Sequence, residues 1–421
     1  MANIVFLVGD YYPHISATAK CADNVIQEIK KTHKVNVICY QNLHENFKCD
    51  GINIVQAGTR LMRFRKRINQ KQLNPGKKQI VYKVLNSLTK VVNFASFLLR
   101  KDSVNRELVN NFYSAIKKCD AIEKVDVIIP VCFPFEGLVA AYEFKRKNSG
   151  VSLIPYLFDP FTDNETLHRF SWIKSLRYRK HKELEEDIYK HSDRVFVINH
   201  ILKSPLFNEN NSIQDKLVVT EHPVLIKPQY FANEEGKTNL INLTYTGALY
   251  KNIRKPNYLM ELLKIINQNL NYKMNMYSFG DGQEILEGYK KEFQDKLVLH
   301  GKVSFNEAQK AISNADILIS IGNTIKNQTP SKVFEYLSFG KPIIHIYSND
   351  DDLVVDTLKK YPLSLCLKED MNCVVENAQK LLEFCKIYTG KEFSFEQCSE
   401  IYYDATPEYI ANQFDKYIYK R

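Results

Sequence analysis

The residues best suited to chemistry in this 421-residue chain lie close together, between Asn327 and Ile344. Proline often opens a helix, and a helix that begins at Pro330 would direct free backbone amides, the Ser331 hydroxyl and the Lys332 ammonium group towards a phosphate. Glu335 follows one turn later, where its carboxylate could accept hydrogen bonds from both hydroxyls of a ribose. The segment therefore predicts a nucleotide site, with a merely solvated Glu335 as the alternative.

The same segment, PSKVFEYLSFGKPII at residues 330–344, resembles the donor-site signature of GT-B glycosyltransferases, in particular glycosyltransferase family 4. Gly280, in the sequence Gly-Asp-Gly, resembles the glycine turn of that family, and Val303 resembles the loop that holds the nucleotide base. These similarities occur in the order that the family has, along the whole C-terminal half of the chain. The resemblance implies a nucleoside-diphosphate sugar of the UDP or GDP type as co-substrate, and no cofactor.

The resemblance also implies a cation for the donor diphosphate, downstream of the first glycine of the second domain, Gly247. Counting back from the helix expected at Leu259 places this cation at Arg254. A guanidinium group suits a diphosphate because it donates hydrogen bonds in a planar fork. Lys251 and Lys255 flank this position and could share the role, and a solvated basic loop is the alternative.

The residues of the catalytic side depart from the family's pattern. The glutamate that the family has eight residues before the ribose-binding one is Asn327 here, and its His-Asp pair is Phe158 and Asp159. Its glycine-rich first loop is replaced by residues 13–17, where His14 could touch the transferred sugar or be an ordinary loop histidine. We take Asp159, His14 and Asn327 as candidate catalytic residues, without assigning a nucleophile or base.

No metal site is expected. The run Asp350 to Asp352 is interpreted as a solvated loop, because cations and helix ends can neutralise a diphosphate without a metal. The nine cysteines include no C-x-x-C pair, which fits neither a zinc site nor a disulfide framework. With no leader and no run of about 20 apolar residues, a cytoplasmic protein is expected.

Apolar runs of strand length alternate with helix-forming segments in both halves of the chain, which predicts an α/β protein. The expected strands are 4–8, 35–39, 125–132, 152–158, 195–198, 242–246, 273–279, 297–300, 317–321 and 343–347, with helices over 19–31 and 257–267. We expect a GT-B arrangement of two Rossmann-like, doubly wound domains that face a central cleft. The expected domains are an acceptor domain at 1–229, a donor domain at 230–404, and a C-terminal helix at 405–421 that packs back on the first.

The net charge of +10 comes largely from residues 60–101 and 169–182. Between Asp50 and Asp102 the sequence contains no acidic residue. An apolar stripe repeats there at helical spacing: Ile80, Val81, Val84, Leu85, Leu88, Val91, Val92, Ala95, Leu98 and Leu99. A basic amphipathic helix of this kind predicts contact with an anionic membrane, and packing of the stripe on the N-terminal domain is the alternative. Nucleic-acid binding is disfavoured, because no stacking-aromatic or recognition-helix module is present.

Together these features predict a glycosyltransferase that moves a sugar from a nucleoside-diphosphate sugar to a saccharide or polyprenyl-diphosphate-linked acceptor. The resemblance implies retention of anomeric configuration. A role in bacterial cell-surface polysaccharide or glycolipid synthesis is expected, and the basic amphipathic segment predicts an enzyme that is peripheral on the inner membrane face. One alternative is a non-catalytic GT-B subunit that binds a nucleotide or a partner enzyme, supported by the departures at Asn327 and Phe158. Another is a nucleotide-sugar epimerase of similar architecture.

Overall fold

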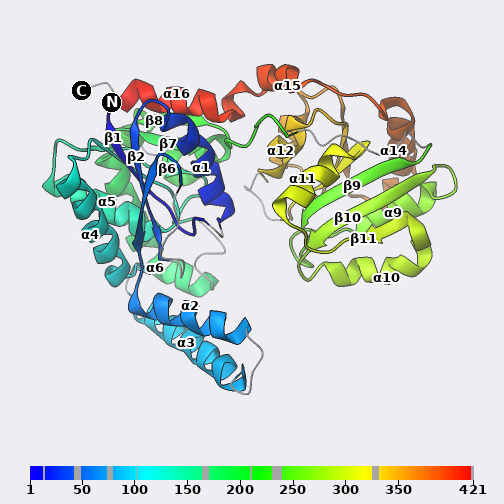
Figure 1. The fold of residues 1–421 in the computed structure, drawn as a ribbon. Coiled ribbons are helices and arrows are strands. Elements are labelled where there is room, and N and C mark those ends of the chain that lie inside the picture. Colours follow the sequence, from blue (N-terminus) through cyan, green and yellow to red (C-terminus); the bar gives the residue numbers. More distant parts are fainter. Residues whose placement is uncertain are drawn as a thin grey trace. The chain divides into compact units, whose positions relative to one another are not determined.

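The chain forms two compact units (Figure 1). The computed structural model describes residues 1–12, 15–41, 49–73, 79–100, 102–163, 170–208, 211–229, 239–324 and 331–418. Unit 1 comprises residues 1–223 and 407–421, and unit 2 comprises residues 224–406. Unit 1 is therefore built from two stretches of chain that lie far apart in the sequence, and residues 224–229 belong to unit 2.

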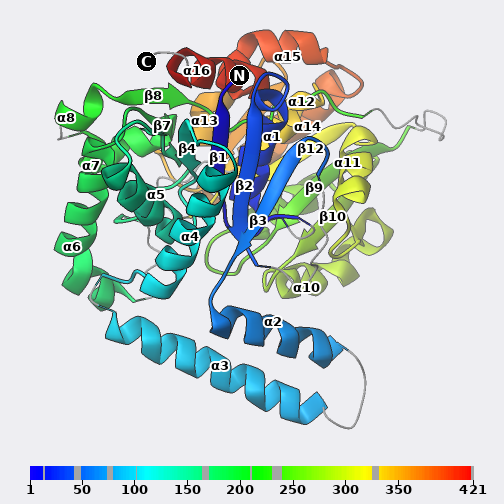
Figure 2. The same ribbon diagram turned by 60° about the vertical axis from the view of Figure 1, so that its left-hand side comes forward.

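Unit 1 begins with a five-stranded parallel sheet in the order β3-β2-β1-β4-β5. Its strands are β1 (Asn3–Leu7), β2 (Lys34–Tyr40), β3 (Ile52–Ala57), β4 (Val127–Pro130) and β5 (Ser152–Leu153). The intervening helices include α1 (Ala17–Ile29), α4 (Arg106–Ile122) and α5 (Phe135–Lys147). Every residue of β1 is buried, as expected for the centre of a parallel sheet covered on both faces (Figure 2).

The single strand predicted over 152–158 is wrong, because the chain changes sheet within it. The amide of Ile154 still donates to the Ile128 carbonyl, at 2.9 Å, whereas the Pro155 carbonyl accepts from the Phe196 amide, at 2.8 Å. Proline has no N–H group with which to continue the first ladder. A second parallel sheet follows, in the order β6 (Tyr156–Leu157), β7 (Val195–Ile198) and β8 (Leu217–Thr220).

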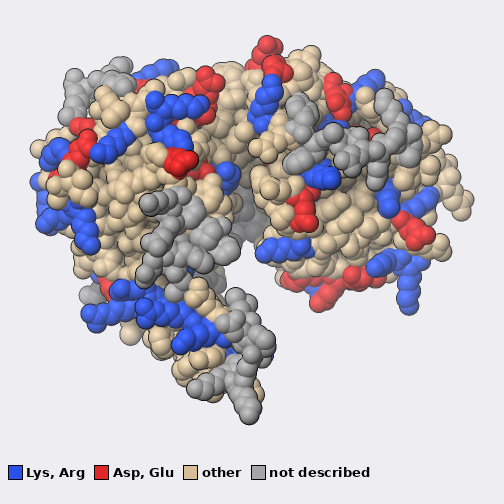
Figure 3. Space-filling view, viewed as in Figure 1, with Lys and Arg blue, Asp and Glu red and all other residues tan. Residues whose placement is uncertain are grey.

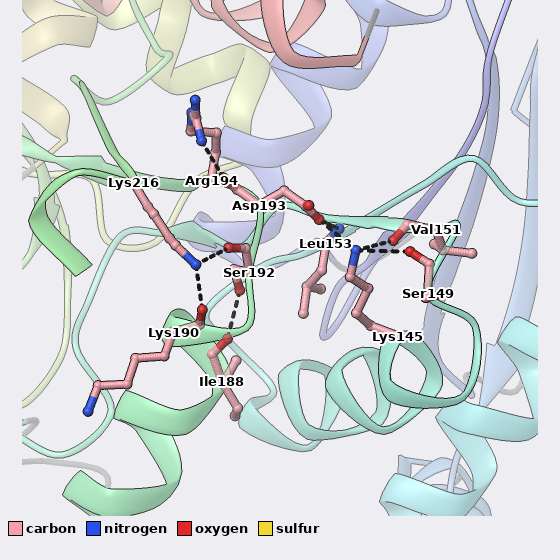
Figure 4. Close-up of polar contacts among 10 residues, drawn as sticks. All are labelled: Lys145, Ser149, Val151, Leu153, Ile188, Lys190, Ser192, Asp193, Arg194 and Lys216. Atoms are coloured by element: carbon pink, nitrogen blue, oxygen red, sulfur yellow. Dashed lines mark hydrogen bonds and ion pairs between the residues drawn. The ribbon is translucent and has the colours of Figure 1, made fainter. Parts of the chain in front are cut away.

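A polar network fixes the amino ends of this second sheet (Figure 4). Asp193, just before β7, accepts a hydrogen bond from the Leu153 amide at 2.8 Å and pairs with Lys145 of α5 at 3.0 Å. Lys216, just before β8, donates to the Ser192 carbonyl at 2.9 Å. Because these contacts lie at the amino ends of the strands, they leave the carboxyl ends to other residues.

The last helix, α16 (Pro407–Ile418), belongs to the core of unit 1. Phe414 is fully buried and stacks on Phe196 of β7, with ring centroids 3.7 Å apart and planes 5° from parallel. Asp415 pairs with Nε2 of His33 at 3.0 Å. The helix at the end of the chain is thus part of the first unit's packing.

The remaining helices of unit 1 are α2 (Arg60–Leu73), α3 (Gln79–Leu99), α6 (Ser171–Lys190), α7 (Pro205–Asn208) and α8 (Asn211–Gln214). The helices α2 and α3 lie side by side in both ribbon views (Figures 1 and 2). Within the described residues, no helix combines the length and the hydropathy needed to cross a bilayer.

Unit 2 contains one six-stranded parallel sheet in the order β11-β10-β9-β12-β13-β14. Its strands are β9 (Ile241–Ala248), β10 (Tyr272–Phe279), β11 (Leu297–Leu299), β12 (Ile317–Ile321), β13 (Ile343–Tyr347) and β14 (Ser364–Lys368). Its helices are α9 (Asn257–Ile266), α10 (Gln283–Phe293), α11 (Phe305–Ser313), α12 (Lys332–Ser338), α13 (Leu353–Leu358), α14 (Val374–Tyr388) and α15 (Phe395–Ile401). The strand order reverses between β9 and β12, the point at which doubly wound sheets bind ligands.

The contribution of α16 to unit 1 generates a prediction. Phe414→Ala removes a fully buried ring from the contact with Phe196, so it should lower the free energy of unfolding of unit 1 by about 3–5 kcal/mol. Asn412→Ala, an exposed change on the same helix, should cost less than about 0.5 kcal/mol. Urea unfolding followed by the fluorescence of the single tryptophan, Trp172, measures both, and equal stability of the two variants would contradict the assignment.

Candidate functional site

The carboxyl edge of the unit 2 sheet gathers the residues that the sequence singled out. Arg254 lies in the loop after β9, Gly280 directly follows β10, and Asn323 comes two residues after β12. Since the carboxyl ends of parallel strands meet at one edge, segments that are distant in the sequence become neighbours. The edge is the candidate binding site of this unit.

Arg254 is held at this edge by neutral partners. Its Nε and Nη2 donate to Oδ1 of Asn323, at 3.0 and 2.8 Å, and Nη1 is 3.3 Å from the Ala248 carbonyl. Among the described residues no carboxylate lies within 4.0 Å of its guanidinium. Because amide and carbonyl oxygens orient the group without neutralising it, its full positive charge remains for an anionic ligand.

Asn323 is a residue that the sequence analysis missed. The signal that could have found it is a polar amide directly after Gly322, where the strand β12 has ended. Its side chain acts on the site through Arg254.

The two lysines that flank Arg254 have carboxylate neighbours. The ammonium group of Lys251 pairs with Glu284, and the Lys251 backbone amide donates to Asp281 at 3.0 Å. Burial raises the pKa of Glu369, and the nearby charge of Lys255 lowers it. Of the three expected cations, Arg254 is therefore the one best arranged to receive a diphosphate.

Two glycines shape the backbone around this cation. Gly280 has a φ of +105°, and a Cβ atom there would lie 2.2 Å from the Leu249 carbonyl oxygen, so only glycine fits. At Gly247 a Cβ atom would lie 3.3 Å from the hydroxyl oxygen of Tyr245, which donates to the Ala248 carbonyl at 2.8 Å. Both glycines act by allowing close packing of the loop after β9.

Glu335 lies on α12 with both carboxylate oxygens engaged. Oε2 pairs with Nζ of Lys332 at 2.6 Å, and Oε1 accepts a hydrogen bond from Gln309 of α11. The side chain keeps 20% of its surface exposed, so a ligand can reach it. Gln309 is a second residue that the sequence analysis missed.

The other expected donor residues are placed less directly. Ser331 is half-buried and immediately precedes α12, and Val303 is half-buried in the loop between β11 and α11. Pro330, His14 and Asn327 lie outside the described residues.

Unit 1 presents a second cluster, at the carboxyl ends of its three-stranded sheet. Asp159 follows β6, His200 follows β7 in a short 3-10 helix, and Glu221 and His222 follow β8. Oε1 of Glu221 lies 2.9 Å from both Nδ1 and the backbone nitrogen of His222. The imidazole of His222 lies near-parallel to the rings of Phe158 and His200, at centroid distances of 6.0 and 6.2 Å.

Burial controls the ionisation of this cluster. It raises the pKa of Asp159 from 3.8 to about 6, and the charge of His222 opposes this shift. It lowers the pKa of His200 from 6.5 to about 4, helped by His222. The Nε2 atom of His200 is buried and has no hydrogen-bond partner among the described residues. A carboxyl group that titrates near neutral pH beside an oriented imidazole can bind hydroxyl groups or exchange a proton.

The acidic run 350–352 is not solvated throughout, as was expected, because the Asp352 side chain is only 7% exposed and lies 3.4 Å from Nε2 of His345. Asp350 pairs with Lys368 at 2.5 Å, Asp351 is exposed, and Asp352 caps α13 by accepting from the Val354 amide at 2.8 Å. Within the described ranges, no three histidine, cysteine or acidic side chains are grouped as metal ligands would be.

Comparison with known proteins identifies the fold. No protein-family model and no curated protein sequence matches the chain. A glycosyltransferase from Rickettsia africae ESF-5 is similar in structure, with a TM-score of 0.64, 14% identity and coverage of 100% of this chain and 98% of that one. The apo lipopolysaccharide outer core galactosyltransferase WaaB has a TM-score of 0.57, 14% identity and 99% coverage of both chains. Anabaena HepE in complex with UDP and glucose has a TM-score of 0.56, 10% identity and coverage of 98% and 95%. The chain thus has the expected GT-B fold over its whole length, with two Rossmann-like units.

The unit 1 cluster predicts a measurable ionisation. In ¹³C NMR of the aspartate carboxyl carbons, Asp159 should titrate with a pKa of about 6. His222→Gln should raise this pKa further, because the cation that favours the carboxylate is lost while the burial stays. His191→Gln, at an exposed histidine directly after α6, should leave it unchanged. A pKa of Asp159 below 4.5, or one that is the same in the His222 variant, would contradict the arrangement.

Proposed function

We propose that this protein is a glycosyltransferase that uses a nucleoside-diphosphate sugar held by unit 2. The observation that carries the proposal is the Arg254 guanidinium, oriented by neutral partners at the carboxyl edge of β9 and β12. The GT-B fold supports it, since similar structures include a galactosyltransferase and a protein in complex with UDP and glucose. The base and the sugar of the donor are left open between UDP and GDP types.

In the proposed reaction, the bond between the anomeric carbon and the diphosphate oxygen breaks, and a bond from that carbon to an acceptor hydroxyl oxygen forms. The hydroxyl proton leaves with the diphosphate or to solvent. Arg254 and Lys332 stabilise the negative charge that develops on the diphosphate, and Asn323 positions the guanidinium. The carboxylate of Glu335 accepts hydrogen bonds from the ribose hydroxyls. Retention of configuration follows only from the resemblance to family 4.

We place the acceptor in unit 1, where Asp159 and the Glu221–His222 pair offer groups that bind hydroxyls. A saccharide presents several hydroxyls, each both donor and acceptor, and a carboxyl group with an imidazole can satisfy both kinds. His14 and Asn327 are kept as further candidates on the catalytic side.

A non-catalytic GT-B subunit is the second candidate. It is favoured by Phe158, which is buried at the position where family 4 has a histidine. A mass-spectrometric screen of a nucleotide-sugar panel separates the candidates, because donor turnover excludes the non-catalytic subunit. An acceptor-dependent product would further exclude an epimerase.

We further propose that the acceptor is linked to a polyprenyl diphosphate and that unit 1 attaches to the inner face of an anionic membrane. The support is the surface of α2 and α3. Basic side chains gather over this part of unit 1 (Figure 3), and the apolar stripe of α3 is turned outward: Ile80, Val84, Leu88, Val91 and Leu99 are each more than half exposed. Of the stripe expected from the sequence, Leu85 is half-buried. Packing on the rest of unit 1 therefore does not explain the stripe.

The donor site predicts a loss of nucleotide affinity. Arg254→Ala and Glu335→Ala should each weaken UDP or GDP binding by about 10- to 100-fold, since a charged hydrogen bond contributes about 1.5–3 kcal/mol. Asn323→Ala should weaken it less, because it only releases the guanidinium. The matched control is Lys264→Ala on α9, which removes a cation whose Nζ atom lies 2.7 Å from Oε1 of Glu292. Calorimetric titration measures each variant, and undiminished affinity of both the Arg254 and Glu335 variants for both nucleotides would refute the donor site.

The proposed attachment predicts salt-sensitive binding to vesicles. Replacing Arg63, Arg65, Lys66 and Arg67 by serine should reduce cosedimentation with anionic vesicles at low ionic strength, because each basic group contributes about 1 kcal/mol near such a surface. A control variant with Lys290, Lys291, Lys360 and Lys386 of unit 2 changed to serine loses the same charge elsewhere. If neither wild type nor control sediments with the vesicles, a soluble acceptor becomes the better proposal.

A further inference from the structure

The first two turns of α6 carry an exposed apolar face that the sequence analysis did not connect with a membrane. Trp172 is 59% exposed and Leu176, one turn later, is 75% exposed. Phe170, directly before the helix, is 45% exposed. Large apolar side chains at i and i+4 project from the same side of a helix, so Trp172 and Leu176 form one patch.

This patch is continuous with α3 through a chain of aromatic rings. Phe94 of α3 contacts Phe170, with ring centroids 5.9 Å apart, and Phe170 lies near-parallel to Trp172 at 6.3 Å. The outward stripe of α3 ends beside this contact, at Leu98 and Leu99. The apolar surface therefore extends from one helix onto the other.

Arg177 fixes the two helices in this arrangement. Its Nη2 donates to the carbonyls of Phe97 and Leu98 at the end of α3, at 3.1 and 2.8 Å, and its guanidinium lies 5.0 Å from the centre of the Phe97 ring. Its Nη1 donates to Ser103 at 2.9 Å. Since Arg177 is itself buried and caps the last carbonyls of α3, it is structural and leaves the apolar side chains to face outward.

Basic residues predominate around the patch. No acidic residue occurs between positions 51 and 101 or between positions 164 and 182, apart from Glu165 outside the described residues. The described part of this second segment contributes Lys174 and Lys180, whereas Arg179 and Lys182 are paired with Glu183 and Glu186 further along α6, at 2.8 and 3.9 Å. Two copies of such a surface would repel each other, whereas an anionic lipid surface is complementary to it.

We propose that α3 and the first two turns of α6 form one surface that inserts into the headgroup region of an anionic bilayer, with Trp172 at the interface. An indole ring suits that depth because it joins a large apolar area to an N–H donor. The proposal rests on the proposed attachment of unit 1 to a membrane, and it is independent of the donor chemistry. It extends the apolar contact of α3 onto the start of α6.

Trp172 is the only tryptophan of the chain, so its fluorescence reports on this surface alone. On titration with vesicles of phosphatidylcholine and phosphatidylglycerol at 3:1, the emission should shift to shorter wavelength, and lipids brominated near the headgroup should quench it. Leu176→Ser should weaken the vesicle partition constant by roughly tenfold, as expected when a large apolar side chain no longer enters the interface. Ile122→Ser, at an 80% exposed residue of α4, should leave it unchanged.

Several outcomes would overturn the proposal. Cosedimentation without a change in Trp172 emission would show that α6 stays in water, even though the membrane attachment itself holds. An equal shift with pure phosphatidylcholine vesicles would remove the role of anionic lipid. A shift that appears without vesicles when the protein concentration is raised would identify a second copy of the chain as the partner. Calorimetric titration of UDP and GDP in vesicle-free buffer reports the donor site separately, so failure of one proposal is distinguishable from failure of the other.

Discussion

The carboxyl ends of parallel strands lie at one edge of each sheet, and the loops that carry most of the described candidate binding residues meet because of this constraint. In unit 2 the strands β9, β10 and β12 deliver Arg254, Gly280 and Asn323 to that edge, from three different parts of the chain. In unit 1 the short strands β6 and β8 deliver Asp159 and the Glu221–His222 pair in the same way. The amino ends of β7 and β8 are instead closed by structural contacts such as Asp193 with Lys145.

Charge alone does not distinguish the cations of the unit 2 edge, but their partners do. Lys251 has a carboxylate partner and Lys255 has one nearby, whereas Arg254 is oriented by an amide and a carbonyl. A cation bound by neutral oxygens keeps its charge for a ligand, while a cation in an ion pair must first exchange partners. The Glu335–Lys332 pair illustrates the second case, because in the proposed donor site both groups exchange this contact for one with the nucleotide.

Unit 1 combines a polar edge with an unusual apolar exterior. Pro155 sends the chain from one sheet to the next and so creates the separate edge at which Asp159 and His222 meet. His222, in the loop after β8, lies beside Phe158, in the loop after β6. Phe158 stands at the position where family 4 has a histidine, so His222 brings an imidazole close to that position. On the surface, α2, α3 and the start of α6 pair positive charge with exposed apolar side chains, a combination typical of interfacial helices.

The sequence by itself determined the α/β class, the doubly wound pattern in both halves and most strands of unit 2. Parallel strands that are buried on both faces have continuous apolar sequences, which can be recognised without a structure. Three strands have the expected bounds: β7 of unit 1, and β12 and β13 of unit 2. It did not predict the change of sheet at Pro155, nor the strands β3, β8 and β14, which depend on which neighbour is available to pair. It placed Arg254 but could not show that Asn323 orients it, or that Gln309 contacts Glu335, since these partners are 69 and 26 positions away. Only the tertiary structure decided which side of α3 faces outward, because an amphipathic pattern fixes a stripe on a helix and leaves open whether protein or solvent covers it.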